Sequence, residues 1–357
     1  MPSLFDITKP FFHALDPETA HKVSIAAMKA GFAPKYEAVD DPKLKTTLWG
    51  RTFNNPIGLA AGFDKNAEVI APMLNIGFGF VEVGTVTPKP QDGNPRPRVF
   101  RDVKSEAVIN RMGFPNGGLE VFKTNLVKFL DKRPHPSGII GINIGMNKTQ
   151  KEPAKDYCRL IRALGPYADY FTINISSPNT PGLRNLQDPE NLQELIEKVL
   201  EERKKSCGKE DPPPLLVKFA PDLDDNEQHA IANTVLKTDI NGIIVTNTTL
   251  DRPDFLPKKF KSEQGGLSGK PLTQKSTDVI RNFYKHTGGK VPIIGIGGVS
   301  SGQDAYDKIC AGASLVQLYS ALVFHGPELV TQICRDLVTC LDHDGHKHLN
   351  EAIGSKA

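Results

Sequence analysis

Beyond residue 55 the chain alternates short apolar runs with amphipathic segments. The eight apolar runs are residues 57–60, 80–83, 139–142, 171–173, 215–217, 243–245, 293–296 and 315–318. Segments with helical periodicity lie between most of these runs, for example residues 191–205, 225–237 and 303–311. Because strands that alternate with helices pair in parallel, this pattern predicts an α/β protein. Eight such units predict a (β/α)8 TIM barrel.

A doubly wound open sheet is the alternative to the barrel. Such a sheet usually carries a G-x-G-x-x-G turn after an early strand, and the sequence has no such turn. Two intervals between the apolar runs, residues 85–138 and 247–290, are longer than a simple crossover needs. We expect these insertions to shape a site at one end of the barrel.

The first 34 residues predict a pair of short helices. One face of the first helix is apolar, and Asp16 followed by Pro17 is a typical start for the second. Two interpretations remain open, a helix hairpin packed on the barrel and an amphipathic pair that touches a membrane surface. The charges of the segment balance, which excludes a polybasic lipid anchor. These residues alone favour the packed hairpin.

Composition narrows the class of protein only slightly. The chain has 357 residues, of which 39% are hydrophobic and 24% charged, with a net charge of +3. This balance gives no reason to expect nucleic acid as a partner. The five cysteines form no C-x-x-C pair and predict reduced, intracellular thiols. No apolar run reaches 18 residues and no cleavable signal is visible, so no membrane span is predicted.

Three histidines, His343, His346 and His348, cluster near the C-terminus. They suit either a metal site or an exposed, flexible tail. We favour the tail, because no acidic or cysteine ligand is in step with them.

Polar residues follow the predicted strands where each strand stops. The clearest case is the run Y-F-T-I-N-I-S-S-P-N-T-P-G at residues 170–182, in which a buried strand ends in serine, asparagine, proline and glycine. A simple Asx or serine turn is the plainer interpretation. In a parallel barrel, however, all such strand ends meet at one mouth, where substrates bind. The other strand-end residues are Ala61, Gly62, Lys65, Thr85, Asn143, Lys218, Thr246, Asn247, Thr248, Gly297, Gly298, Tyr319 and Ser320.

The chemistry of these strand ends favours a flat, anionic ligand and a phosphate. Glycines after the seventh strand let backbone N–H groups approach phosphate oxygens. Asn143, Asn174, Asn179 and Asn247 pair donors with acceptors and suit a heterocycle. Lys65 and Lys218 are costly to bury without an anionic partner. The sequence shows no paired carboxylates for a glycosidase, no metal-ligand constellation and no Ser-His-Asp triad.

Five motifs in this order resemble dihydroorotate dehydrogenases, specifically the class 2, quinone-dependent form of animal mitochondria. They are A-A-G-F-D-K at 60–65, N-R-M-G-F at 110–114, N-I-S-S-P-N at 174–179, T-N-T at 246–248 and G-L-S-G-K at 266–270. The resemblance covers nearly the whole chain. It implies oxidation of (S)-dihydroorotate to orotate in pyrimidine biosynthesis, with hydride passed to FMN and electrons to ubiquinone. It also implies that residues 1–40 form a quinone-tunnel and membrane-contact extension and residues 41–357 the FMN-binding barrel.

The resemblance implies a role for each matching residue. Ser177 would be the catalytic base that removes the C5 proton. The implied substrate residues are Lys65, Asn110, Arg111, Met112, Gly113, Phe114, Asn174, Asn179, Asn247 and Thr248. The implied flavin residues are Ala61, Gly62, Lys65, Thr85, Asn143, Asn174, Lys218, Thr246, Ser268, Gly269, Gly297, Gly298, Tyr319 and Ser320. The implied quinone-tunnel residues are Phe11, Phe12, Leu15, His21, Arg101 and Tyr319.

Given this resemblance, the helix pair is expected to contact a membrane, and no obligate protein partner is implied. Residues 299–305 look most like animal enzymes, which implies the mitochondrial inner membrane without the transit peptide and spanning helix; a bacterial cytoplasmic membrane is the alternative. Met146 departs from the lysine that family members often have. A serine hydroxyl is a weak base, so a relay through a bound water and a neighbouring threonine is expected. Phe114, Thr172 and Thr248 are candidates for the surrounding wall and its hydrogen bonds.

Two other functions remain as hypotheses. One is a class 1-like or dihydropyrimidine-type flavoenzyme with a soluble electron acceptor, against which Ser177 and the helix pair argue. The other is a barrel that has lost catalysis and binds a ligand or partner, against which the complete set of strand-end residues argues.

Overall fold

The computed structural model describes residues 4–207 and 212–357, and its centre is a closed barrel of eight parallel strands. In chain order the barrel strands are β3 (Ile57–Leu59), β4 (Phe80–Val86), β7 (Ile139–Ile144), β8 (Tyr170–Asn174), β9 (Leu215–Phe219), β10 (Gly242–Val245), β12 (Ile293–Ile296) and β13 (Leu315–Leu318). All eight predicted runs are barrel strands, so the predicted TIM barrel is confirmed.

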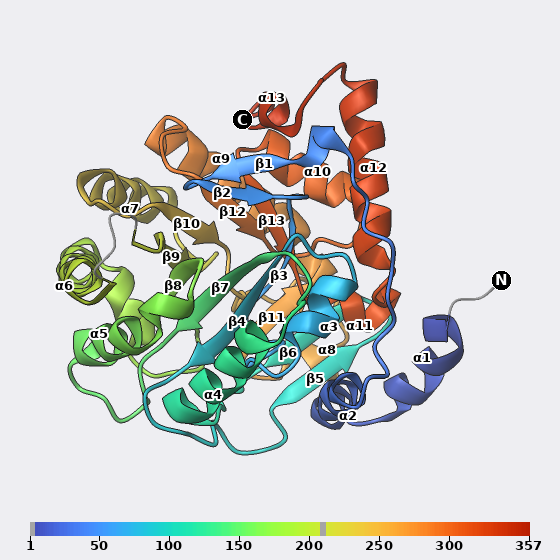
Figure 1. Cartoon of the computed structure of the whole chain (residues 1–357), viewed down its shortest axis with the longest axis horizontal. Coiled ribbons are helices and arrows are strands. Elements are labelled where there is room, and N and C mark those ends of the chain that lie inside the picture. The colour runs from blue at the N-terminus through green and yellow to red at the C-terminus, as the bar shows by residue number, and fades with distance from the viewer. Residues whose placement is uncertain (1–3, 208–211) are drawn as a thin grey trace.

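Helices surround the barrel on the outside (Figure 1). They are α3 (Ile70–Asn75), α4 (Gly118–Asp131), α5 (Pro153–Leu164), α6 (Pro189–Cys207), α7 (Asp225–Lys237), α9 (Thr273–Thr287), α10 (Gly302–Cys310), α11 (Ala321–His325) and α12 (Leu329–His343). Their apolar faces and the outward faces of the strands form one continuous core. Each helix therefore buries its stripe against the sheet, as the alternating pattern requires.

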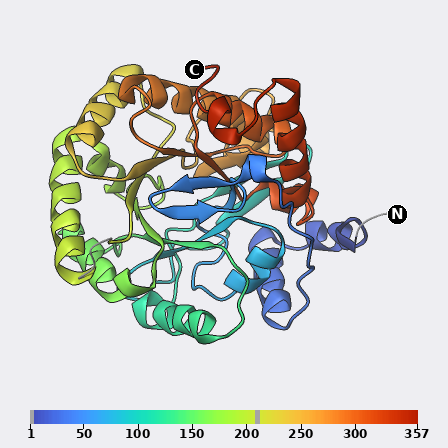
Figure 2. The same cartoon turned by 45° about the horizontal axis from the view of Figure 1, so that its top comes forward.

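A hairpin of β1 (Thr46–Leu48) and β2 (Arg51–Phe53) lies across one end of the barrel, as Figure 2 shows. Phe53 from this hairpin packs against Phe80 and Tyr170 inside the barrel, together with inward side chains of four other strands. Gly141 leaves room for this packing, because a Cβ there would lie 2.1 Å from the Tyr170 ring. The N-terminal end of the barrel is thus filled, and the C-terminal end carries the cavity described below.

The two long insertions pair with each other at the open end of the barrel. The first contributes β5 (Val99–Asp102) and β6 (Ala107–Asn110), and the second contributes the short helix α8 (Lys258–Lys261) and β11 (Gly266–Gly269). The order β11-β6-β5 makes a three-stranded antiparallel sheet, with Gly266 opposite Asn110. The expectation that the insertions shape one end of the barrel is confirmed.

The N-terminal helices are α1 (Leu4–Ala14) and α2 (Pro17–Lys29), which lie beside β5 and α11 in Figure 1. Asp16 caps α2 as predicted, since its carboxylate accepts a hydrogen bond of 3.0 Å from the Thr19 N–H. Within the described ranges, no helix has the length and apolar character needed to cross a membrane.

The prediction of a flexible C-terminal tail was wrong. His343 is the last residue of α12, and the His348 ring caps the short helix α13 (Leu349–Ala352). Beyond α13, the Lys356 N–H donates to the Cys310 carbonyl over 2.9 Å, which fastens the end of the chain to α10. Buried Leu349 explains this order, because it packs into the main core. No metal-binding group of three such side chains exists among the described residues.

Candidate active site

A cavity of about 590 Å³ lies over the C-terminal ends of the barrel strands. Its walls come from all three parts of the molecule: the strand-end loops, the antiparallel sheet of the insertions and the helices α1 and α2. One end is polar and reaches into the barrel. The other end is lined by apolar side chains of the helix pair, such as Phe5, Phe12 and Met28.

The cavity collects most of the residues expected from the sequence. From the substrate and flavin sets, the lining includes Ala61, Gly62, Lys65, Thr85, Asn110, Met112, Gly113, Phe114, Asn174, Ser177, Asn179, Lys218, Thr246, Asn247, Thr248, Ser268, Gly269, Gly297, Gly298, Tyr319 and Ser320. From the tunnel set it includes Phe12, His21 and Arg101. Segments from eleven places in the chain therefore converge on one space.

Four expected residues do not line the cavity. Asn143 lies beneath it, where its side chain bonds to other side chains. The Arg111 guanidinium stacks over the Phe100 ring and pairs with Glu263 at 2.9 Å, and its expected part in substrate binding stays a prediction. Phe11 is 60% exposed on α1, and Leu15 lies in the turn between the helices. The helical spacing placed these two on an apolar face but could not tell an inward from an outward position.

Glu82 organises the layer of side chains below the cavity. This fully buried carboxylate accepts hydrogen bonds from Asn143 Nδ2 (2.7 Å), Tyr170 Oη (3.0 Å), Thr172 Oγ1 (3.2 Å) and Gln317 Nε2 (2.9 Å). Thr172 thus bonds within this layer and does not line the cavity. Both Glu82 and Gln317 were missed in the sequence. The signal was there, because each is the single polar residue in its predicted apolar run, 80–83 or 315–318.

Amide and hydroxyl groups above this layer hold one another in place. Asn143 Oδ1 accepts from Thr85 Oγ1 (2.5 Å) and from Asn174 Nδ2 (3.2 Å). Asn247 Nδ2 donates to Ser176 Oγ over 2.9 Å. Asn179 donates its backbone N–H to Ser177 Oγ over 3.3 Å. The polar end of the cavity is thus built before any ligand arrives, which limits the reorganisation that binding requires.

Two lysines bring positive charge to the cavity at a cost. Burial lowers the pKa of Lys65 to about 8, although Asp64 and Glu18 act in the opposite direction. Its ammonium donates to the Gly62 carbonyl over 2.6 Å. Burial also lowers the pKa of Lys218, while Glu82 raises it. An anionic ligand would offset the desolvation of both groups.

Asp64 has a structural part in this site. Its carboxylate accepts from the N–H groups of Glu68 (2.8 Å) and Val69 (2.7 Å), and burial raises its pKa to about 6. It therefore fixes the loop that carries Lys65.

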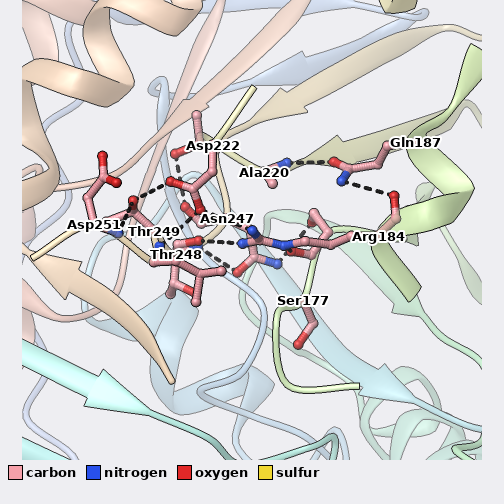
Figure 3. Close-up of polar contacts among 12 residues, drawn as sticks. Ser177, Arg184, Gln187, Ala220, Asp222, Asn247, Thr248, Thr249 and Asp251 are labelled. Atoms are coloured by element: carbon pink, nitrogen blue, oxygen red, sulfur yellow. Dashed lines mark hydrogen bonds and ion pairs between the residues drawn. The ribbon is translucent and has the colours of Figure 1, made fainter. Parts of the chain in front are cut away.

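An arginine that the sequence analysis overlooked ties the loops of the site together (Figure 3). Arg184 donates from Nε to the Ser176 carbonyl (3.1 Å) and from Nη2 to the Thr248 carbonyl (3.1 Å). Its Nη1 pairs with Asp222 at 3.0 Å. Asp222 also accepts from Lys275 and from the Leu250 N–H. The loops after β8, β9 and β10 are thereby held to one another, including the loop that carries Ser177.

Aromatic rings mark the passage from the polar end to the helix pair. The rings of His21, Phe63 and Tyr319 lie 5.2 to 6.4 Å apart, centroid to centroid. Burial lowers the pKa of His21 to about 3, and the charge of Lys65 adds to this effect, so the ring is neutral at physiological pH. Burial raises the pKa of Tyr319.

Together, the closed parallel barrel and its cavity define a (β/α)8-barrel protein. Its ligand site lies at the C-terminal mouth and is lined by polar and positively charged side chains. Comparison with known proteins is more specific. The family model "Dihydroorotate dehydrogenase" matches residues 43–341. This chain belongs to the dihydroorotate dehydrogenase family.

Relatives occur in plants, animals and bacteria. The mitochondrial dihydroorotate dehydrogenase (quinone) of Arabidopsis thaliana is 48% identical, over 99% of this chain and 82% of that protein. The dihydroorotate dehydrogenase (quinone) of Xanthobacter autotrophicus is 50% identical over 98% of both chains. The crystal structure of DHODH from Eimeria tenella in complex with ferulenol superposes with a TM-score of 0.91 at 42% identity, covering 95% of each chain.

Proposed function

We propose that this chain oxidises dihydroorotate to orotate in pyrimidine biosynthesis, with FMN as its cofactor and ubiquinone as the final electron acceptor. Membership of the dihydroorotate dehydrogenase family and the quinone-dependent relatives support the activity. The observation that carries the proposal is the single cavity, which joins polar groups of the barrel mouth to apolar groups of α1 and α2. Such a space suits a polar substrate at one end and an apolar electron acceptor at the other.

The donor set at the barrel mouth fits FMN. Gln317 lines the cavity, and its Oε1 is buried without a hydrogen-bond partner within the described part of the chain. Lys218 offers a cation beside the amides, and the Gly297–Gly298 loop and the bonded hydroxyls of Ser268 and Ser320 (2.8 Å) offer a phosphate site. When bound, FMN supplies the acceptor for a hydride. The flavin residues would be Ala61, Gly62, Lys65, Thr85, Asn174, Lys218, Thr246, Ser268, Gly269, Gly297, Gly298, Tyr319 and Ser320, with Asn143 supporting them from below.

The amides beyond the flavin residues suit the pyrimidine ring. Asn110, Asn174, Asn179 and Asn247 would bond its carbonyl and N–H groups, and Thr248 Oγ1 is a buried hydroxyl with no partner among the described residues. Lys65 would pair with the substrate carboxylate. Met112, Gly113 and Phe114 would form the wall of this compartment.

Ser177 is the proposed base for the C5 proton. It is buried at the cavity wall, and its Oγ already accepts the Asn179 N–H. A hydroxyl must pass its own proton on when it accepts another, because its unperturbed acidity is far too low for a free alkoxide. Thr248 and a bound water are the proposed relay.

We propose that residues 1–40 deliver ubiquinone from a membrane surface to the barrel. The carboxylate of Glu18 on α2 pairs with Arg98 at 2.9 Å, and Arg98 adjoins β5. Arg101 on β5 donates to the His13 (2.6 Å) and Leu15 (3.1 Å) carbonyls in the turn between the helices. The helix pair is thus anchored to the insertion sheet, and Phe12, His21, Arg101 and Tyr319 would line the route.

Three large apolar side chains of this extension, Ile7, Phe11 and Phe32, are mostly exposed. Their exposure supports contact with a membrane. Phe11 would then face lipid instead of quinone. The relatives include proteins named mitochondrial and bacterial ones, so we propose the mitochondrial inner membrane, or a bacterial cytoplasmic membrane, as the location.

An absorbance spectrum with anaerobic addition of dihydroorotate tests the proposed function. We expect a flavin spectrum that bleaches on addition and recovers when a ubiquinone analogue is added. A flavin that dihydroorotate does not bleach would contradict the substrate. Recovery with fumarate or NAD but not with quinone would contradict the electron acceptor.

Replacing Ser177 tests the proposed base. Ser177→Ala should keep the flavin and slow its reduction by dihydroorotate at least about a hundredfold, because a positioned base contributes on that order. Ser177→Cys should move the pH–rate profile of flavin reduction to lower pH, since a thiol ionises near pH ~8.5. Ser355→Ala, at an exposed position, is the control. Near-normal reduction by Ser177→Ala would remove this residue from the role.

The lowered pKa of Lys65 predicts a pH dependence of orotate binding. Orotate prefers the ammonium form, so its dissociation constant should rise as the pH increases above about 8. The limiting slope is about tenfold per pH unit. His21, with a pKa of about 3, and Asp64, with about 6, titrate below this range. Lys65→Arg stays charged and should flatten the dependence in a flavin-absorbance titration. An unchanged slope in this variant would assign the titration to another group, such as Lys218.

Separating the helix pair from the barrel tests its role. Glu18→Ala leaves Arg98 buried without its carboxylate partner, which typically costs about 3–5 kcal/mol and should loosen α2. We expect quinone-dependent turnover to fall at least about tenfold, while flavin reduction by dihydroorotate in stopped flow stays near the wild-type rate. Glu37→Ala, exposed in the same extension, is the matched control. Equal losses in both half-reactions would mean that the helices support the barrel and do not serve quinone.

A further inference from the structure

Lys308 is a fully buried lysine that the proposed mechanism leaves unused. It projects from α10 to the first turns of α9, where its ammonium donates to Thr277 Oγ1 (2.9 Å), to the Thr273 carbonyl (3.2 Å) and to Ser276 Oγ. All three acceptors are neutral oxygens. Across residues 4–207 and 212–357, no carboxylate lies within ion-pair distance of this ammonium.

Burial of the Lys308 ammonium without a carboxylate partner among the described residues disfavours its charged form. Burial lowers the pKa of Lys308 to about 7, and the carboxylates of Asp304, Asp307 and Asp278 act on it only from a distance. An isolated buried cation is unfavourable unless a nearby negative charge compensates it. An anion bound near Lys308 would therefore compensate its charge.

Two hydroxyls in the first turn of α9 hold the glycine loop after β12, and one of them, Ser276 Oγ, also accepts from Lys308. Ser276 Oγ donates to the Gly297 carbonyl over 2.9 Å, and Thr273 Oγ1 donates to the Gly298 carbonyl over 2.7 Å. Both carbonyls are thus turned toward α9. In a planar trans peptide the C=O and the following N–H point in opposite directions. The N–H groups of Gly298 and Val299 therefore point away from α9.

The side away from α9 is the side of the cavity. Gly297, Gly298 and Val299 line the cavity, whereas Thr273, Ser276 and Lys308 do not. The loop also lies directly on α9, since a Cβ on Gly298 would come within 2.2 Å of Thr273 Oγ1. One layer of side chains thus separates the ammonium from a loop that presents two N–H groups to the cavity.

We propose that Lys308 is a positioning residue for the phosphate of FMN, which it stabilises through the Gly297–Gly298 loop without touching it. Its hydrogen bond to Ser276 Oγ supports the contact that holds the Gly297 carbonyl toward α9, and its charge favours a dianion on the far side of the loop. At this depth a charge acts through a medium of low dielectric constant, so its effect extends across one layer of atoms. This inference rests on the proposed function, because it assumes FMN at the barrel mouth.

Competition between FMN and riboflavin isolates the phosphate. The whole chain is equilibrated with mixtures of the two flavins, and the ratio of bound flavins is measured after release. The wild-type protein should prefer FMN strongly. Lys308→Met should reduce this preference at least about tenfold, with little change in riboflavin affinity. Lys285→Met, exposed near the end of α9, should retain the wild-type preference.

A ratio of bound flavins separates a phosphate effect from general damage, because a poorly packed barrel would weaken both flavins equally. An unchanged preference in Lys308→Met would overturn the inference alone, with the proposed function intact. A wild-type chain that binds neither flavin would overturn the proposed cofactor together with the inference.

A second variant covers the case in which Lys308→Met does not fold. Ser276→Ala keeps the lysine and removes the hydroxyl that joins it to the Gly297 carbonyl. We expect a smaller but measurable loss of FMN preference, about threefold. An FMN preference equal to that of the wild type would contradict the role of this connection and the proposal with it.

Discussion

The buried carboxylate of Glu82 is the constraint on which the interior of the barrel depends. A carboxyl group buried in this position has lost its water, and four side-chain donors from β7, β8 and β13 replace that water. Each donor is thereby restricted to one orientation. Asn143 in particular must turn its amide nitrogen down to Glu82, which leaves its oxygen facing up to Thr85 and Asn174. The geometry of the layer below the cavity thus follows from the need to provide hydrogen-bond donors for the buried carboxyl group of Glu82.

The barrel could be predicted from the sequence because its strands are buried on both faces. Each strand is then an almost continuous apolar run, and each run stops where polar residues begin. The mouth residues were predictable for the same reason, since their position after a strand already fixes where they lie. Lys218, the last residue but one of β9, and Asn247, two residues beyond β10, illustrate this, as both line the cavity.

What the sequence did not reveal depends on contacts between distant segments. β6 and β11 are separated by more than 150 residues, and nothing local in either segment specifies the partner that completes the antiparallel sheet. Arg184 lies in the loop between β8 and α6, and only the folded chain shows that it joins three loops. The exposure of Phe11 also depends on contacts between distant segments. The sequence places Phe11 on the apolar face of α1, but only the packing of α1 against the barrel decides whether this side chain is buried or exposed.

The charges around the cavity form a pattern that no single residue explains. Lys65 and Lys218 line the cavity, and Lys308 lies one layer behind it; burial lowers the pKa of all three. Glu82, the carboxylate that faces Lys218 from below, is already surrounded by donors. Apolar side chains at these positions would give a more stable protein, because they carry no desolvation cost of a buried cation. Under the proposed function each lysine would serve one anionic group: Lys65 the substrate carboxylate, Lys218 the flavin ring once it is reduced, and Lys308 the phosphate. Under this proposal, each bound anion would offset the desolvation cost that its lysine carries in the free protein.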